Sequence, residues 1–357
     1  MSVTIKDIAR KAGVNHGAVS HVLRNDAYAQ TLRQETRERI KKIAQEVGYV
    51  RNAYASATRT GTVKLIAYVT VHTPEAQGGM TVYRDISGIL ARATKLGYGV
   101  KIYSDEDLKK NFEDIVAHRI RYVIAASRAE EKQAFIADQC RKNALHLVWI
   151  NQHYGSYPTI SSDNEGAMIQ AVEFLYSLGH RRIAYLYSQL TAFSAAGHYK
   201  GYLEGMEKCG LSTEGLLEGK VDYQNAGKSF LSLPPAKRPT AFVCETQGRA
   251  LAAIYNIQDA GLKVPEDISV TGYGFEGGFN EILRPGITYA LDNPFAVGEG
   301  AVDLVLGRER EDLIRREEGR YAVPTVLRIY GSTAHPAKKS HKGKIITNKA
   351  KEQKEII

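Results

Sequence analysis

The chain contains few cysteines and no long apolar run. Its three cysteines, Cys140, Cys209 and Cys244, are scattered over 357 residues and form no pair at metal-ligand or redox spacing. No apolar run approaches the roughly 18 residues that a membrane-spanning helix requires, and the opening residues lack the pattern of a signal peptide. We therefore expect structural thiols, no membrane partner and a cytoplasmic location.

Catalytic and cofactor motifs are also missing. The sequence contains no G-x-S-x-G, no H-E-x-x-H and no G-x-x-x-x-G-K-S/T pattern. Residues 272–277 match G-x-G-x-x-G, but this segment comes late in the chain and is soon followed by Arg284-Pro285-Gly286 instead of a helix. We expect no catalytic residues, no metal site and no cofactor.

Acidic side chains are scarce at both ends of the chain. Residues 1–61 contain 11 Lys and Arg against 5 Asp and Glu, and residues 338–357 contain 7 Lys against 2 Glu. Because the whole chain carries a formal charge of +9, the 276 residues between these segments sum to −2. A basic N-terminal segment favours contact with phosphates, whereas the basic tail, residues 334–357, is expected to be disordered and solvated.

The N-terminal segment carries the signals of a compact helical unit. Thr4 can cap a first helix, Gly13 suits the tight turn that ends it, and Asn15 can cap a second helix from His16 to about Leu23. A third apolar stripe predicts another helix within residues 31–48. Two short helices joined by a glycine-containing turn predict a helix-turn-helix, with an ordinary helical hairpin as the alternative.

From about residue 63 onward, short β-rich runs alternate with helical stretches. The runs are Leu65–Thr70, Tyr122–Ala125, Leu147–Ile150, Ile183–Leu186, Ala241–Cys244 and Ile268–Thr271. This alternation predicts parallel α/β sheets, with ligands beyond the carboxyl ends of the strands. The apolar content of 43% is sufficient for substantial cores.

Several segments, taken in order and spacing, resemble the LacI family of bacterial repressors over roughly residues 3–333. They are Val3–Val14, Ala18–Leu23, Thr36–Ile40, Gly48–Tyr49, Asn164–Ala167, Leu178–Ala184, Gly261–Val270 and Val323–Arg328. Within the family, Val19–Val22 is most similar to the purine repressor. The resemblance implies an all-α helix-turn-helix head with a hinge helix, followed by an α/β core of two parallel-sheet lobes similar to periplasmic binding proteins.

The resemblance also implies a division of the chain. The expected parts are a DNA-binding head and hinge (1–61), an effector-binding and dimerisation core (62–333) and the basic tail (334–357). Within the core, the first lobe is expected to comprise about 62–161 and 290–321, and the second about 162–289 and 322–333. The chain would then cross between the lobes near residue 161, near 290–294 and near 320–323.

The function implied by the resemblance is that of a transcriptional repressor. A homodimer would bind a roughly palindromic operator in double-stranded DNA, and a small-molecule effector between the lobes would control this binding. The alternative is a solute-binding or enzymatic protein on the same two-lobed fold. Such a protein would have no use for a DNA-binding head.

The resemblance places the DNA-contacting residues in the head and hinge. They are Thr4, Lys6, Asn15, His16, Gly17, Ser20, His21, Thr36, Tyr49, Asn52, Ala55 and Thr58. Because Gly17 has no side chain that could read a base, specificity is expected to depend on His16 and His21. We expect Ser20 to contact a phosphate instead. The segment 24–34 is three residues longer than is usual in the family.

The hinge segment departs from the family pattern. Family members lever apart a central base step with a leucine of the hinge helix, and Thr58 stands at that position here. If the hinge acts as a wedge, Thr58→Leu should strengthen operator binding, since leucine is larger and apolar. An unchanged affinity in a binding titration would contradict the wedge and leave a neighbour such as Tyr54 to supply the apolar contact.

The effector-binding positions depart further from the family. Those inferred are Tyr83, Arg128, Phe193, His198, Thr246, Gln247 and Phe275. His198 replaces a usual arginine, Thr246-Gln247 replaces Asn-Asp, and Gly274-Phe275 replaces Asp-Asp. Because three polar clamps are lost, we expect a ligand that stacks on aromatic side chains more than a pyranose held by charged residues. Ordinary core packing is the alternative for each aromatic residue.

Overall fold

The computed structural model describes residues 3–49, 63–71, 79–190, 193–274, 278–316 and 319–337, except for the side chains of 79–83 and 278–279. The chain divides into two compact units, residues 1–64 and 65–357. The hinge positions Asn52, Ala55 and Thr58 lie outside the described residues.

The head consists of helices α1 (Ile5–Ala12), α2 (His16–Arg24), α3 (Ala27–Thr31) and α4 (Gln34–Glu46). The expected local signals are present. Thr4 and Asp7 form a reciprocal capping box at α1, Gly13 ends it with φ of 63°, and Asn15 Oδ1 accepts from the Ala18 amide at 2.7 Å. These contacts confirm the predicted helix-turn-helix.

The third predicted helix is α4, which lies within the expected residues 31–48. Thr31 ends α3, a short additional helix that Asp26 caps by accepting from the Ala29 amide at 3.2 Å. Leu32 then adopts an extended backbone, so α4 starts only at Gln34. The extra length of segment 24–34 therefore forms one helical turn. It packs on the core of the head, which consists of Ile8, Ala9, Ala12, Val19, Val22, Ala29, Ile40 and Ala44.

The first lobe of the core is built on a seven-stranded sheet. Its order is β11 (Ile314–Arg315), β12 (Arg320–Val323), β5 (Thr159–Ser162), β4 (His146–Ile150), β3 (Tyr122–Ala125), β1 (Leu65–Thr70) and β2 (Gly99–Ser104). All neighbours pair in parallel except β11 with β12. The helices of this lobe are α6 (Gly79–Lys95), α7 (Leu108–Ala117), α8 (Glu130–Lys142) and α13 (Pro294–Val305).

The second lobe is built on a six-stranded sheet. Its order is β13 (Val326–Arg328), β10 (Thr288–Leu291), β9 (Ser269–Gly274), β8 (Ala241–Cys244), β6 (Ile183–Leu186) and β7 (Leu217–Glu218), with only β13 antiparallel. Its helices are α9 (Asn164–Ser177), α10 (Phe193–Lys208), α11 (Lys228–Leu231) and α12 (Gln247–Asp259), with 3-10 turns at Tyr223–Asn225 and Gly278–Glu281. The predicted parallel α/β architecture is confirmed.

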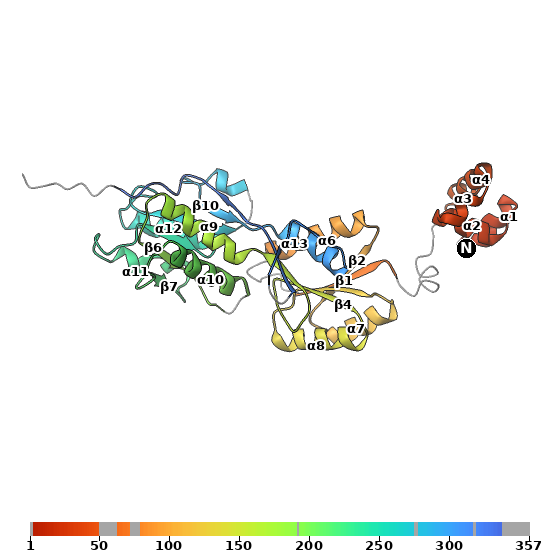
Figure 1. The fold of residues 1–357 in the computed structure, drawn as a ribbon, viewed down its shortest axis with the longest axis horizontal. Helices are drawn as coiled ribbons and strands as arrows, with labels where there is room; N and C mark the ends of the chain where they lie inside the picture. Colours follow the sequence, from red (N-terminus) through yellow and green to blue (C-terminus); the bar gives the residue numbers. More distant parts are fainter. Residues whose placement is uncertain are drawn as a thin grey trace, which may run out of the picture. The chain divides into compact units, whose positions relative to one another are not determined.

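Three connections join the lobes. They follow β5, β10 and β12, so the chain crosses at residue 163, at 292–293 and at 324–325. The first crossing lies two residues after the expected residue 161, the second lies within the expected 290–294, and the third directly follows the expected 320–323. Figure 1 shows α13 beside α6 in the first lobe and α9 beside α10 in the second.

Residues 334–337, which the sequence assigned to a disordered tail, lie against the second lobe. The Ala334 amide donates to Ser269 Oγ at 3.0 Å, and Nδ1 of His335 lies 2.7 Å from the Leu178 carbonyl oxygen. These hydrogen bonds give the last described segment a fixed place on the lobe. Residues 338–357 lie outside the described part of the chain.

Candidate functional site

Helix α2 has one buried face and one polar face. Ala18, Val19 and Val22 are buried in the core of the head, which orients the helix. The other face carries the predicted DNA-contacting residues Asn15, His16, Gly17, Ser20 and His21, of which Asn15 and His16 are exposed and the rest half-buried. Of the remaining predicted positions, Thr4 and Lys6 are exposed, and Thr36 and Tyr49 are half-buried. The head thus presents polar side chains beside a rigid apolar core.

His21 is held by residues that the sequence analysis did not single out. Its Nδ1 lies 3.0 Å from Asp26 Oδ2 and 2.7 Å from Arg24 Nη2. The imidazole also packs on the ring of Tyr28, with centroids 4.4 Å apart. The sequence signal that could have indicated these contacts is the extra length of segment 24–34, which contains Asp26 and Tyr28.

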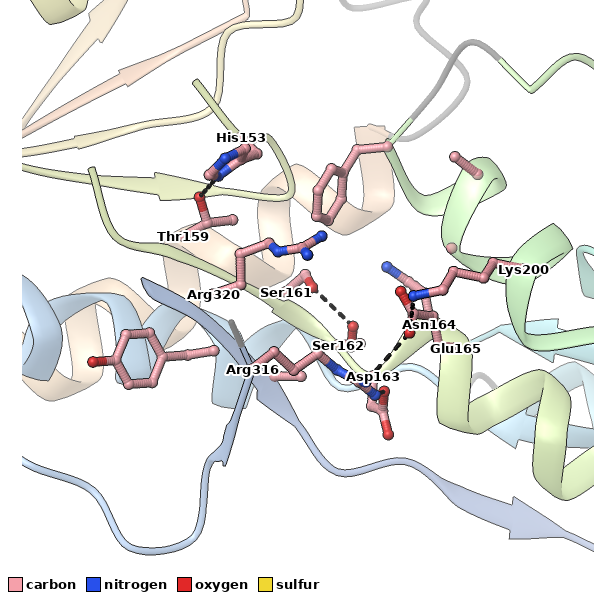
Figure 2. Close-up of a pocket in the computed structure, with 15 residues that line it drawn as sticks. His153, Thr159, Ser161, Ser162, Asp163, Asn164, Glu165, Lys200, Arg316 and Arg320 are labelled. Atoms are coloured by element: carbon pink, nitrogen blue, oxygen red, sulfur yellow. Dashed lines mark hydrogen bonds and ion pairs between the residues drawn. The ribbon is translucent and has the colours of Figure 1, made fainter. Parts of the chain in front are cut away.

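A cavity of about 360 Å³ lies where the two lobes meet (Figure 2). Its wall combines β5, the first crossing, one face of α10 and strand β12. The lining residues are His153, Thr159, Ser161, Ser162, Asp163, Asn164, Glu165, Phe193, Ala196, Gly197, Lys200, Arg316, Arg320, Tyr321 and Ala322. This volume suits a small organic molecule, and an occupant would contact both lobes at once.

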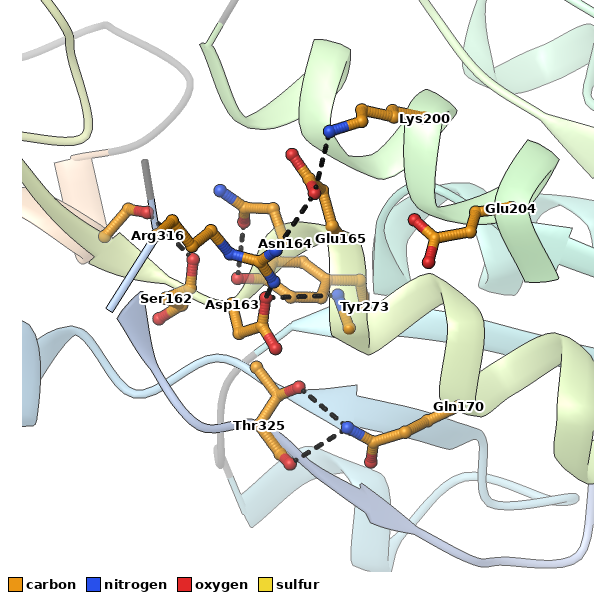
Figure 3. Close-up of polar contacts among 12 residues, drawn as sticks. Ser162, Asp163, Asn164, Glu165, Gln170, Lys200, Glu204, Tyr273, Arg316 and Thr325 are labelled. Carbon is orange, nitrogen blue, oxygen red and sulfur yellow. Dashed lines mark hydrogen bonds and ion pairs between the residues drawn. The ribbon is translucent and has the colours of Figure 1, made fainter. Parts of the chain in front are cut away.

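Ion pairs tie the lobes together along this cavity (Figure 3). Arg316, next to β11 in the first lobe, contacts Asp163 at 2.5 Å and Glu165 at 3.2 Å, at the start of α9. Lys200 of α10 lies 3.1 Å from Glu165. The two acidic side chains on the cavity wall are therefore already paired with cations.

Hydrogen bonds connect the crossings themselves. Ser162 Oγ donates to Asp292 Oδ1 at 2.6 Å and accepts from the Asn293 amide at 3.3 Å, which joins the first crossing to the second. Tyr273 donates its hydroxyl hydrogen to Asn164 Oδ1 at 3.1 Å, from β9 to the start of α9. The Ser162 contacts thus join two of the connections between the lobes, and the Tyr273 contact fixes the start of α9 within the second lobe.

Of the predicted effector-binding residues whose side chains the structure describes, only Phe193 lines the wall of this cavity. Arg128 is exposed on the first lobe, and Thr246 caps α12 by accepting from the Arg249 amide at 3.2 Å. Gln247 is buried beside Gly274. The side chain of Tyr83 and all of Phe275 lie outside the described residues.

His198 lies inside the second lobe and does not line the cavity. It is 4% exposed, its ring centroid lies 4.2 Å from that of Tyr273, and its Nε2 has no hydrogen-bond partner. Burial lowers the pKa of His198 from 6.5 to about 3, so the imidazole is neutral in the folded protein. The residues that the sequence missed, such as Arg316 and Arg320, lie more than 100 positions after α10.

The described residues include neither a cluster suited to a metal ion nor a helix that could span a membrane. They contain no group of three or more His, Cys, Asp or Glu side chains suited to a metal ion. Within the same ranges, each helix is too short or too polar to cross a membrane.

Two family models match the chain. Residues 4–52 match the bacterial regulatory proteins of the lacI family, and residues 172–333 match a periplasmic binding protein-like domain. The first covers the helix-turn-helix, and the second covers most of the second lobe together with the last two crossings.

Relatives named as repressors match along most of the chain. The transcriptional repressor CytR of Escherichia coli K12 is 27% identical over 321 residues, which cover 85% of this chain and 89% of the relative. The probable repressor ExuR of Bacillus subtilis is 28% identical over 291 residues, with 79% and 84% covered, and PurR of Aliivibrio fischeri is 27% identical, with 86% and 92% covered.

Solved structures share the fold. A Lac repressor dimer bound to operator and the anti-inducer ONPF matches with a TM-score of 0.69 at 22% identity, covering 94% of this chain and 100% of that chain. A complex of the regulator CelR with cellobiose matches with a TM-score of 0.60 at 20% identity, with 92% and 99% covered. Residues 4–52 therefore match the helix-turn-helix domain of the lacI family, and they precede a periplasmic binding protein-like domain in a core that shares the fold of the solved Lac repressor and CelR structures.

Proposed function

We propose that this protein is a transcriptional repressor that binds a specific operator in double-stranded DNA as a homodimer. The observation that carries the proposal is the polar face of α2, held outward by the buried Val19 and Val22 in the segment that matches the lacI family. A helix presented in this way fits the major groove, and two copies fit two half-sites. CytR, ExuR and PurR are named as repressors, and the Lac repressor was solved as a dimer on its operator.

A selection from a pool of random duplexes tests operator binding. We expect the full-length protein to enrich one roughly palindromic sequence, with an affinity that falls steeply as salt increases. Ser20→Glu should reduce this affinity at least about 100-fold, because it adds a negative charge to the face that meets phosphates. Gln45→Glu, which adds the same charge to exposed α4, serves as the control. Equal binding to all duplexes would contradict the proposal.

We also propose that a small-molecule effector binds in the cavity between the lobes and controls operator affinity. The cavity wall includes residues of both lobes and of the first crossing, so an occupant can favour one closure angle over another. Such coupling is typically worth about 1 to 3 kcal/mol, which corresponds to a roughly 5- to 150-fold change in DNA affinity. The residues proposed to hold the effector are Phe193, Lys200, Arg316, Arg320 and Tyr321.

A thermal-shift screen tests the effector site. We expect one member of a panel of sugars, nucleobases, nucleosides and aromatic metabolites to raise the melting temperature and to change operator affinity. Ala196→Phe should abolish both effects, because Ala196 lines the cavity on α10. Glu207→Phe, at an exposed position of the same helix, should retain them. A ligand that still binds Ala196→Phe equally well would place the site elsewhere.

We further propose a cytoplasmic location and no enzymatic activity. The carboxylates on the cavity wall, Asp163 and Glu165, are occupied by ion pairs with Arg316 and Lys200. They are therefore poorly placed to act as general bases. Each metabolite that stabilises the protein should keep its concentration during prolonged incubation with it. Consumption of such a metabolite would contradict the absence of enzymatic activity.

A further inference from the structure

The additional turn between α2 and α4 encloses a side chain of the helix proposed to read DNA. Asp26, the cap of α3, has both carboxylate oxygens within 3.1 Å of Nδ1 of His21. The ring of Tyr28 covers one side of the imidazole, and Arg24 Nη2 lies 3.0 Å from Asp26 Oδ2. Arg24 is itself anchored, since its Nε donates to the Ser20 carbonyl oxygen at 3.1 Å.

The carboxylate of Asp26 favours a proton on Nδ1 of His21. Partial burial opposes ionisation of Asp26, but hydrogen bonds from His21 and the Ala29 amide and the charge of Arg24 keep its pKa below the usual value. An ionised carboxylate only accepts hydrogen bonds. A lone pair on Nδ1 would face two negatively charged oxygens, whereas a proton there donates to them. Arg24 Nη2 lies 2.7 Å from Nδ1 and 3.0 Å from Asp26 Oδ2, and with Nδ1 protonated its hydrogens can be donated only to the carboxylate.

The other ring nitrogen is left for a ligand. Nε2 of His21 has no hydrogen-bond partner within the ranges that the structure describes, and the side chain is 34% exposed. A neutral imidazole protonated on Nδ1 has an acceptor lone pair on Nε2. In the major groove, the base edges that donate are the amino groups of cytosine and adenine, while guanine offers only acceptors there.

We propose that Asp26 is a positioning residue that holds His21 in its Nδ1-protonated form, so that Nε2 of His21 accepts a hydrogen bond from the amino group of a cytosine or an adenine in the major groove. This inference rests on the proposed DNA-binding function. The added turn would then have a role in recognition, because Asp26 caps α3 and also orients the side chain of His21. The opposite tautomer, in which Nδ1 accepts from Arg24 and Nε2 donates, would favour guanine instead.

Selection from random duplexes with the full-length protein and Asp26→Ser tests the proposal. Serine can still cap α3 but removes the carboxylate from His21. We expect the same half-site from both proteins, except that the variant loses discrimination about 5- to 150-fold at one base pair of each half-site. Glu35→Ser, which removes one acidic charge from exposed α4 in the same head, should retain every base preference.

The protonation state gives a second readout that a purely structural role would not move. The full chain would be labelled with ¹⁵N-histidine and recorded well above the ordinary pKa of histidine, and the His21 signals identified by their loss in His21→Asn. We expect Nδ1 to carry the proton in the wild type and the populations to shift toward Nε2 in Asp26→Ser.

The outcomes separate this inference from the proposed function. A wild-type protein that enriches no sequence would contradict DNA recognition itself. Enrichment with an unchanged preference in Asp26→Ser, or a proton on Nε2 of His21 in the wild type, would overturn only the role of Asp26.

Discussion

Replacing Gly88 with alanine is expected to destabilise the first lobe by about 3 kcal/mol. A Cβ atom at Gly88 of α6 would lie 2.0 Å from the carbonyl oxygen of Phe295 in α13, and one at Gly298 would lie 2.2 Å from the carbonyl oxygen of Asp85. The two helices thus touch backbone to backbone, and no side-chain rotation can relieve the clash. The higher helix propensity of alanine offsets only about 1 kcal/mol.

A urea titration followed by the fluorescence of Trp149 measures this change. Trp149 is the single tryptophan of the chain and is fully buried in β4, so it reports on the first lobe. The control is Gly248→Ala in α12, where the nearest atom is a ring carbon of Tyr223 at 3.3 Å, which can move aside. We expect the control to change stability by less than about 1 kcal/mol. Identical unfolding midpoints for Gly88→Ala and the wild type would contradict the close helix contact.

Acidification from pH 7.5 to pH 5 is expected to lower the free energy of unfolding of the second lobe by about 2 kcal/mol through His198 alone. Burial lowers the pKa of His198 from 6.5 to about 3, so the unfolded chain binds a proton that the folded lobe cannot. The full stability is present above pH 6.5, and it falls as the pH drops toward 3. Burial also lowers the pKa of His180, which adds a loss of the same sign.

Calorimetric unfolding of His198→Leu over this pH range tests the assignment. The variant should lose less stability on acidification than the wild type, because leucine has a similar size and does not bind a proton. His146→Leu, at an exposed histidine of the first lobe, is the control and should retain the wild-type pH dependence. Parallel pH profiles for His198→Leu and the wild type would show that His198 does not oppose protonation in the folded lobe.

The head was predictable because its signals are local. Thr4 with Asp7, Gly13, and Asn15 with Ala18 each act within five residues, so their spacing in the sequence is also their geometry in the fold. The six predicted strands are likewise short apolar runs that form the buried centre of each sheet. Edge strands were not predicted, since β2 is partly exposed and β11 and β7 have only two residues each.

The proposed effector site was much less predictable than the head. Positions taken from the family pattern, such as Thr246 and His198, cap a helix or pack inside the lobe in this protein. The cavity instead takes its cations from Lys200, Arg316 and Arg320, which come together only because β12 returns to pair with β5. Nothing near Arg316 in the sequence indicates Asp163 as its partner.

The sequence by itself determined a basic helix-turn-helix head ahead of an α/β core. Helix caps, turns and apolar periodicity act between residues that are close in the chain. Tertiary structure alone decided which side chains share a wall between the lobes and which nitrogen of His21 is left open. Those outcomes depend on how the two sheets of the core pack and on how the added turn folds back over α2. The spacing of residues in the sequence determines neither.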